Sequence, residues 1–154
     1  MAKYVAYEMQ GKRQIANFKE DRFGHMAAPQ KWKSRRQLRV GNSEEHLALV
    51  RQLWCTLGTE RYRIECHHLK SGPALKERGV GMKATDRWAV PLFYARHWDL
   101  ENIGSRREFD FFMEHGINPY DLANALWANT GDLVRMSRVL KAHQEQARKA
   151  GRGP

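Results

Sequence analysis

Two adjacent histidines, His67 and His68, end an expected strand and are followed by a Lys-Ser-Gly-Pro turn. A second pair, His97 and Glu101, lies on an expected helix at a spacing of four residues, so both side chains leave the same helix face. Neighbouring residues of a strand point to opposite faces, unless one is turned at the strand's end. One of the two adjacent histidines can therefore join His97 and Glu101 around a single cation, while the other acts on a bound water.

Two imidazoles and one carboxylate suit a divalent transition metal or Mg²⁺ that keeps open coordination positions. Such a layout is suited to phosphodiester hydrolysis. The cation neutralises the phosphate and the leaving oxygen, while a neutral imidazole takes a proton from water. The alternative is structural, because a lone histidine on an apolar strand is more often a satisfied core group than a ligand. Two neighbouring histidines with a His/Glu pair beyond them favour the metal site.

The order of the elements decides whether these side chains can meet. Apolar spacing, capping residues and glycine stops predict an α+β fold, in which a β-hairpin brings the end of its first strand against the following helix. Ser105 and Glu108 form a capping-box pattern at the start of one helix. We expect a short strand at 4–9, a helix at 43–58, strands at 61–69 and 86–93 separated by a loop or irregular hairpin at 70–85, and helices at 94–104, 105–116, 118–131 and 132–150.

The chain has 154 residues and a formal net charge of +10, which is concentrated at its two ends. Residues 1–43 carry ten Lys/Arg against three Asp/Glu, and residues 133–154 carry six against one. The centre, 44–132, is close to neutral, with eleven against thirteen. Basic ends on a small domain favour a polyanionic partner, most often nucleic acid. The alternative is a solubility tail without a specific partner.

The charge distribution suggests a basic N-terminal arm (1–42), a central domain (43–131) and a basic C-terminal helix and tail (132–154). Within the arm, Trp32 could stack on a base or anchor the arm to the core. No apolar run approaches the length of a membrane span, and the start of the chain lacks the apolar region of a secretory signal. Two cysteines do not make a disulfide framework, so we expect a cytoplasmic protein without a membrane partner.

One long segment resembles the ββα-metal fingers of HNH endonucleases. It runs along "HLALVRQLWCTLG…ECHHLKSG…GVGMKATDRWAVPLFYARHWDLENIGSRREFDFF…GINPYDLANALW" and covers about 80 residues. Its block "GVGMKATDRWAVPLFYARH" is similar to "GMGMKPSDRW.VPLC..HH", which is characteristic of the phage-type branch that includes a recombination enhancement function nuclease. The resemblance implies a ββα-metal core with additional helices, DNA as the partner, and phosphodiester cleavage in phage or mobile-element recombination.

The resemblance also implies roles, one position at a time. The implied metal ligands are His67, His97 and Glu101, the last standing where the family often places a second helix histidine. His68 fits the general base. The asparagine that usually orients this base is replaced by Trp88, which cannot accept a proton from an imidazole N–H. Asp86, expected two residues earlier on the same strand face, could substitute for it.

Many family members carry a zinc knuckle, and the corresponding positions here are Cys55, Gly58, Phe93 and Arg96. A structural zinc needs four ligands, so we expect none, with Phe93 filling the space and Cys55 buried as a small hydrophobe. Cys66 could be a further ligand, but a reduced core thiol is the expectation. The expected cofactor is a divalent metal, Mg²⁺, Mn²⁺ or Zn²⁺.

Five basic residues in and beside segment 70–85 would face DNA in this fold: Lys70, Lys76, Arg78, Lys83 and Arg87. A solvated loop explains the same charges equally well. The basic stripe of the C-terminal helix could add phosphate contacts, or that helix could simply dock on the domain.

The departures from the family pattern support a competing function. Trp88 and the missing zinc ligands favour an HNH-fold module that binds DNA or a protein partner, as an adaptor or inhibitor, without cutting. The retained histidines favour the enzyme. A third possibility is a mimic that binds a protein partner and no DNA.

Overall fold

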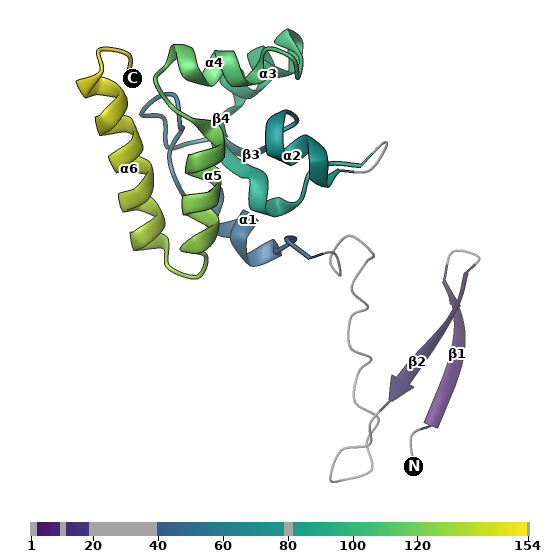
Figure 1. Cartoon of the computed structure of the whole chain (residues 1–154). Helices are drawn as coiled ribbons and strands as arrows, with labels where there is room; N and C mark the ends of the chain where they lie inside the picture. Colours follow the sequence, from purple (N-terminus) through teal and green to yellow (C-terminus); the bar gives the residue numbers. More distant parts are fainter. Residues whose placement is uncertain (1–2, 10–11, 19–39, 79–81, 154) are drawn as a thin grey trace. The chain divides into compact units, whose positions relative to one another are not determined.

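The computed structural model of the 154-residue chain has an α+β fold and divides into two compact units, residues 1–34 and 35–154 (Figure 1). It describes residues 3–9, 12–18, 40–78 and 82–153. None of the helices in these ranges has the length and the apolar character that crossing a bilayer requires.

The first unit contains a β-hairpin. Strand β1 (Lys3–Met9) pairs antiparallel with β2 (Lys12–Phe18), in a register that joins Lys3 to Phe18 and Met9 to Lys12. A strand at 4–9 was expected from the sequence, whereas the second strand was not. The rest of the expected basic arm, including Trp32, lies largely outside the described residues.

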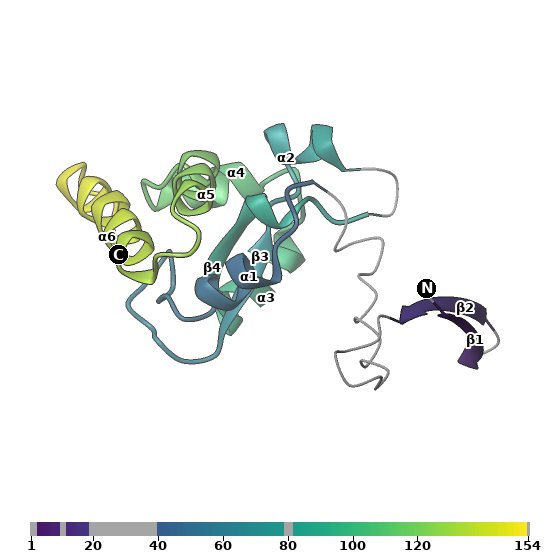
Figure 2. The same cartoon turned by 90° about the horizontal axis from the view of Figure 1, so that it is seen from below.

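The second unit is built on two short antiparallel strands, β3 (Ile64–His68) and β4 (Ala89–Phe93), with His67 opposite Val90 and His68 opposite Ala89. Helix α3 (Tyr94–Ile103) follows β4 without a loop and packs on both strands (Figure 2). Gly104, with φ of 86°, ends this helix in a conformation that side chains disfavour. The remaining elements are α1 (Glu44–Val50), α2 (Gly72–Glu77), the 3₁₀ turn η1 (Asp86–Trp88), α4 (Glu108–Glu114), α5 (Pro119–Ala128) and α6 (Leu133–Lys149).

The expected helix at 43–58 is correct at its start and wrong at its end. Ser43 caps α1 by accepting a hydrogen bond from the His46 backbone N–H. The helix ends at Val50, and most of the side chains that follow turn inward: Leu53, Cys55, Thr56 and Leu57 are all buried. A helix would turn part of this set to solvent. The chain instead turns at 55–58 and donates the Thr56 N–H to the Pro91 carbonyl of β4.

Two further expectations need correction. Segment 70–85 was expected to be irregular, but it contains α2, which begins behind Ser71 with Pro73 in its first turn. The expected strand at 86–93 begins with η1 and becomes β4 only at Ala89. Asp86 is therefore on a 3₁₀ turn rather than on a strand. In this turn its backbone N–H donates a hydrogen bond to the Asn42 side-chain oxygen.

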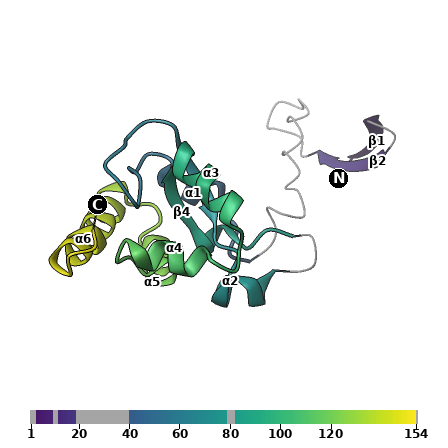
Figure 3. The same ribbon diagram turned by 90° about the horizontal axis from the view of Figure 1, so that it is seen from above.

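Helices α5 and α6 lie side by side in each view (Figures 1, 2 and 3). Asn118 caps α5 and Asp132 caps α6, each with its side chain. Gln144 of α6 is buried, and its amide N–H₂ lies within hydrogen-bond distance of the Cys55, Thr56 and Gly58 carbonyls, at 2.9–3.0 Å. Helix α6 is therefore docked on the core, in the same unit as residues 43–131.

Candidate metal centre

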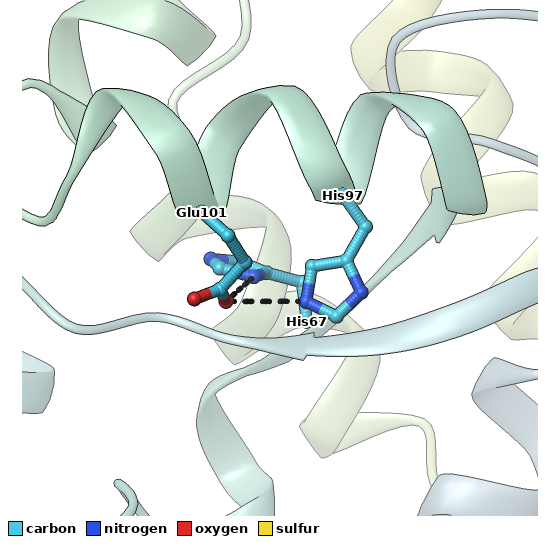
Figure 4. A group of neighbouring side chains, drawn as sticks. All are labelled: His67, His97 and Glu101. Atoms are coloured by element: carbon cyan, nitrogen blue, oxygen red, sulfur yellow. Dashed lines mark ion pairs between the residues drawn. The ribbon is translucent and has the colours of Figure 1, made fainter.

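The three residues expected to hold a metal come together at the face of the strand pair that α3 covers. His67 is the fourth residue of β3 and its side chain is 1% exposed. His97 and Glu101 are one turn apart on α3, and their side chains reach down toward the strand (Figure 4). Because α3 continues directly from β4, the pairing of β4 with β3 fixes which helix residues stand over His67.

The donor atoms of these residues converge. Glu101 Oε1 lies 3.8 Å from His67 Nδ1 and 3.4 Å from His97 Nε2, and all three ligand atoms lie within 4.8 Å of one another (Figure 4). Ligands about 2.0–2.2 Å from one metal ion stand roughly 3–4 Å apart. The spacing therefore fits a common ion that contacts one nitrogen of each histidine and one carboxylate oxygen, with small adjustments.

Each histidine is oriented by a second carboxylate. His67 Nε2 is 2.7 Å from Glu108 Oε1, and His97 Nδ1 is 2.5 Å from Glu65 Oε2. A carboxylate only accepts, so each of these nitrogens carries the hydrogen and the opposite ring nitrogen carries the lone pair. The lone pairs are thus on His67 Nδ1 and His97 Nε2, the two atoms that face Glu101. Metal-binding histidines are typically held in this way.

His67 Nδ1 provides the test of whether the residues fit a cation. It is buried and, among the described residues, has no hydrogen-bond partner. An unsatisfied buried nitrogen is costly unless something else occupies its lone pair. Burial lowers the pKa of His67, against the opposing effect of Glu108, so the ring is neutral at physiological pH. A neutral ring with its lone pair toward a carboxylate suits a metal ion.

Glu108 was missed as a site residue, because its position after Ser105 matched a capping box. The structure corrects this: Arg107 precedes the first turn of α4, and the Glu108 side chain is 1% exposed and turned toward β3. Its Oε2 accepts hydrogen bonds from the Ser71 hydroxyl and from the backbone N–H groups of Lys70 and Ser71. Burial raises the pKa of Glu108, but these bonds and the one from His67 outweigh it, so the pKa is lowered.

Glu65 was also missed, although a sequence signal for it exists. It stands two residues before His67 on β3, so both side chains share one strand face. No comparable signal exists for Glu108, which comes from a helix 41 positions away.

Lys70, expected to contact DNA, pairs in the structure with a candidate ligand. Its ammonium binds Glu101 Oε2, while Oε1 of the same carboxylate faces the histidines. This hydrogen bond lowers the pKa of Glu101, which therefore stays ionised at neutral pH. The pair is partly exposed, at 34% for Lys70 and 43% for Glu101, so a competing cation can reach it.

His68 faces the opposite side of the strand pair. Its neighbour Cys66, on the same strand face, donates a hydrogen bond to the Leu47 carbonyl of α1. His68 Nε2 lies 2.8 Å from Asp86 Oδ1, and Asp86 Oδ2 accepts the Ser43 backbone N–H at 3.0 Å. The structure thus brings Asp86 to His68, the contact expected of a substitute for the usual asparagine. By the same argument from the carboxylate, His68 Nδ1 carries the lone pair.

Trp88, the residue at the usual asparagine position, belongs to the core. It is buried, and its indole N–H donates to Glu77 Oε2 at 2.8 Å. Its backbone carbonyl accepts the Leu69 N–H as β3 ends. Trp88 therefore stabilises the end of the strand pair, through its buried ring and its backbone hydrogen bond to Leu69.

The other basic residues expected at DNA are spread over several elements. Lys83 lines a pocket of about 300 Å³ together with His68 and Arg51, a residue that the sequence analysis missed. Lys76 is exposed on α2, and Arg78 is its half-buried C-terminal cap. Arg87 is held by α5, because its guanidinium donates to Asn124 Oδ1 at 2.8 and 3.1 Å.

Two of the four positions compared with a zinc knuckle, Cys55 and Phe93, are part of the apolar packing. Cys55 is fully buried in the core, and Phe93 packs against it with ring contacts to Tyr62 and Tyr94. Burial raises the pKa of the Cys55 thiol and that of Cys66, the latter to about 11. Both thiols are therefore protonated at neutral pH.

Comparison of the chain with family models, curated proteins and solved structures gave no match.

Proposed function

We propose that this chain is a metal-dependent DNA endonuclease with an HNH-type ββα-metal core made of β3, β4 and α3. The observation that carries the proposal is the convergence of His67 Nδ1, His97 Nε2 and Glu101 Oε1, with a carboxylate behind each histidine. The setting that we propose is phage or mobile-element recombination in the cytoplasm, which rests on the sequence resemblance alone.

His67, His97 and Glu101 would hold one divalent ion, with Mg²⁺, Mn²⁺ and Zn²⁺ as the candidates. Two neutral nitrogens and one carboxylate leave coordination positions for substrate and water. When bound, such an ion supplies charge neutralisation at the scissile phosphate and at the leaving 3′ oxygen. Glu108 and Glu65 keep both imidazoles in the tautomer and orientation that binding requires.

His68 is proposed as the general base. Its Nδ1 would accept a proton from the attacking water, while Nε2–H stays bonded to Asp86. The Asp86 carboxylate would stabilise the imidazolium that forms. Asp86 is itself fixed by the backbone N–H of Ser43 at the start of α1, so the base has little freedom to rotate.

β3 pairs only with β4 in its sheet, so among the described elements no strand covers its other edge. We place the phosphate at this edge, between the two strand faces. Glu65 at this edge lines both the pocket that contains His68 and the pocket that contains His97 and Glu101. Arg51 and Lys83 border the His68 side, where they would attract the phosphate backbone.

The test is the incubation of plasmid DNA with the full chain and Mg²⁺ or Mn²⁺. The expected result is nicking that needs the metal and that His68→Ala lowers by roughly 10²–10⁴-fold, which is the typical contribution of a general base. His143→Ala, on α6, is the matched control and should cut like the unaltered chain. The absence of cutting with every divalent metal, by a folded protein that binds DNA, would overturn the proposal.

The Lys70–Glu101 pair favours a second candidate, a DNA-binding module that does not cut. In this function the ammonium of Lys70 replaces the cation as the partner of Glu101. DNA binding would then be unchanged by chelators and by divalent metals. It would still fall steeply with salt, because the basic segments contact phosphates.

A further inference from the structure

Helix α3 carries an aromatic face beside the candidate ligands. Trp98 is 69% exposed and Tyr94 is 37% exposed, and their spacing of four residues places them on one side of the helix. On α3, His97 comes directly before Trp98, and Glu101 comes three residues after it. The face that carries the aromatic rings therefore adjoins the face that carries these two candidate ligands. Trp98 and Tyr94 together expose an aromatic patch, which is more informative than a single exposed apolar residue.

The two faces meet in one pocket of about 520 Å³. Tyr94 and Trp98 form apolar walls, and Glu65, His97, Asp99 and Glu101 supply the polar groups. A ligand that fills this pocket would therefore contact the aromatic rings and two of the candidate metal ligands, His97 and Glu101.

The charge of the pocket selects among the parts of a nucleic acid. Glu65, Asp99 and Glu101 are carboxylates, and although Lys70 pairs with Glu101, the lining as a whole is acidic and unfavourable for a phosphate. A nucleobase is neutral, its flat face matches an aromatic ring, and its amino and imino N–H groups can donate to carboxylates. The pocket thus fits a base, while the pocket on the His68 side of β3, where Arg51 and Lys83 stand beside Glu44 and Glu65, offers cations to the backbone.

The segment before β3 supports the aromatic face. Arg63 has φ of 49°, the only non-glycine residue with positive φ among the described residues. A left-handed arginine is strained, and such strain is retained where the surroundings impose it. Here the strained backbone of Arg63 places its own guanidinium over the Tyr94 ring, with the guanidinium carbon 3.7 Å from the ring centre. The Arg63 carbonyl also accepts the Tyr94 N–H, so both the ring and the first turn of α3 are fixed in place.

We propose that Trp98 and Tyr94 bind an unpaired nucleobase next to the scissile phosphate, so that the substrate is single-stranded or locally unpaired DNA. This inference rests on the proposed function for the position of the phosphate. A base inside a duplex is already stacked on both faces and cannot enter the pocket without being extruded. A stacked base contributes about 1–3 kcal/mol, which corresponds to roughly 5- to 150-fold in affinity.

A protein partner is the other occupant that an exposed tryptophan and arginine suggest. The pocket argues against it, because its polar lining is acidic and is shared with the candidate metal ligands. A nucleobase explains both features, whereas a protein side chain explains only the aromatic rings.

The experiment compares binding of two labelled oligonucleotides to the full chain by fluorescence anisotropy, with Ca²⁺ present and no cleaving metal. One is a short thymidine strand and the other is the same strand with abasic sites. The unaltered chain should bind the thymidine strand about 5- to 150-fold more tightly. Trp98→Ala should bind both strands equally, and Trp98→Phe should recover most of the preference. Val134→Ala, an exposed apolar residue of α6, is the control and should bind as the unaltered chain does.

The outcomes separate this inference from the proposed function. Equal binding of both strands by the unaltered chain overturns the inference, and so does a preference that Trp98→Ala retains; plasmid nicking can still succeed in either case. A Trp98-dependent preference without cutting in any metal supports the base pocket and removes the nuclease. Trp98-dependent self-association, with no preference between the strands, overturns the inference in favour of a protein interface.

Discussion

Glu108 Oε1 accepts a hydrogen bond from His67 Nε2 at 2.7 Å, although 41 positions separate the two residues along the chain. Both side chains are 1% exposed. This contact joins α4 to β3 and sets the tautomer of the imidazole, so the folding of the helical part and the chemistry of the candidate centre depend on the same bond. An additional helix is therefore part of the site rather than an accessory to it.

Replacing Glu108 with glutamine should affect both metal binding and stability. The amide cannot accept strongly from His67 and from the Lys70–Ser71 backbone together, so we expect metal affinity to fall by about 10- to 100-fold. The free energy of unfolding should fall by about 2 kcal/mol or more, since hydrogen bonds to a charged group are lost. Isothermal titration with Zn²⁺ and Mn²⁺, and urea unfolding, measure the two effects.

The control is Glu114→Gln, at the exposed end of α4, which should change neither quantity. Unchanged Zn²⁺ and Mn²⁺ affinities in a folded Glu108→Gln protein would contradict the assigned role of Glu108.

Replacing Lys70 with methionine should strengthen cation binding. In the structure the ammonium of Lys70 occupies one oxygen of Glu101, and a divalent ion must compete with it for the carboxylate. A partly exposed ion pair contributes about 0.2–1 kcal/mol, so the Zn²⁺ or Mn²⁺ dissociation constant should fall by up to about five-fold. The measurement is calorimetric titration at fixed ionic strength.

Lys76→Met, on the exposed side of α2, removes the same charge away from Glu101 and should leave the dissociation constant unchanged. If Lys70→Met bound the ions more weakly than the unaltered chain, Lys70 would be assisting the cation rather than competing with it.

The sequence predicts the elements that carry their own local signals. The α3, α5 and α6 ranges agree with expectation, because each has a capping side chain, a glycine stop or a clear apolar stripe. The end of α1 could not be predicted, because the residues after it are fixed by a hydrogen bond to the distant Pro91 carbonyl and by burial against the rest of the core.

The same distinction applies to the candidate site. The spacing of His97 and Glu101 on a helix, and the adjacency of His67 and His68, are local properties that the sequence displays. The contribution of Glu108 depends on how α4 packs, and local propensity gave it a different role, that of a cap. The contact of Lys70 with Glu101 could not be predicted, because charge alone cannot tell a phosphate contact from a neighbouring carboxylate, and the DNA contact stays a prediction.

Replacing Gln144 with leucine should weaken the docking of α6. The buried amide N–H₂ lies within hydrogen-bond distance of the Cys55, Thr56 and Gly58 carbonyls, and its oxygen accepts the Trp54 indole N–H at 2.7 Å. Leucine has a similar volume but leaves these groups unpaired, at about 1–3 kcal/mol for each unsatisfied group. We expect a loss of at least about 2 kcal/mol in urea unfolding. Gln146→Leu, exposed on the same helix, should cost little, and equal losses for both variants would refute the docking role.

Mild acid should lower the stability of the protein, because His46 is protonated more readily in the unfolded chain than in the folded one. The side chain is fully buried, and burial lowers its pKa to about 4, although Asp86 opposes this effect and His68 adds to it. Thr130 Oγ1 donates to the Trp127 carbonyl, so it accepts from His46 Nδ1–H, and the neutral ring keeps its lone pair on the buried Nε2. Nε2 has no partner among the described residues, so a proton added there would be an unpaired buried charge.

The sign of the pH effect follows from the direction of this shift. In the unfolded chain His46 takes up a proton as pH falls through 6.5, whereas in the folded chain it does so only near a pKa of about 4. Stability should therefore be unaffected by His46 above pH 6.5 and should fall progressively between 6.5 and about 4, by roughly 3 kcal/mol in all. His46→Gln should lose this share of the pH dependence, measured by urea unfolding at a series of pH values. His67 and His143, whose pKa values burial also lowers, remain in both proteins, so the difference between the two curves reports His46. Parallel curves over this range would show that His46 is protonated as readily in the folded chain as in the unfolded one.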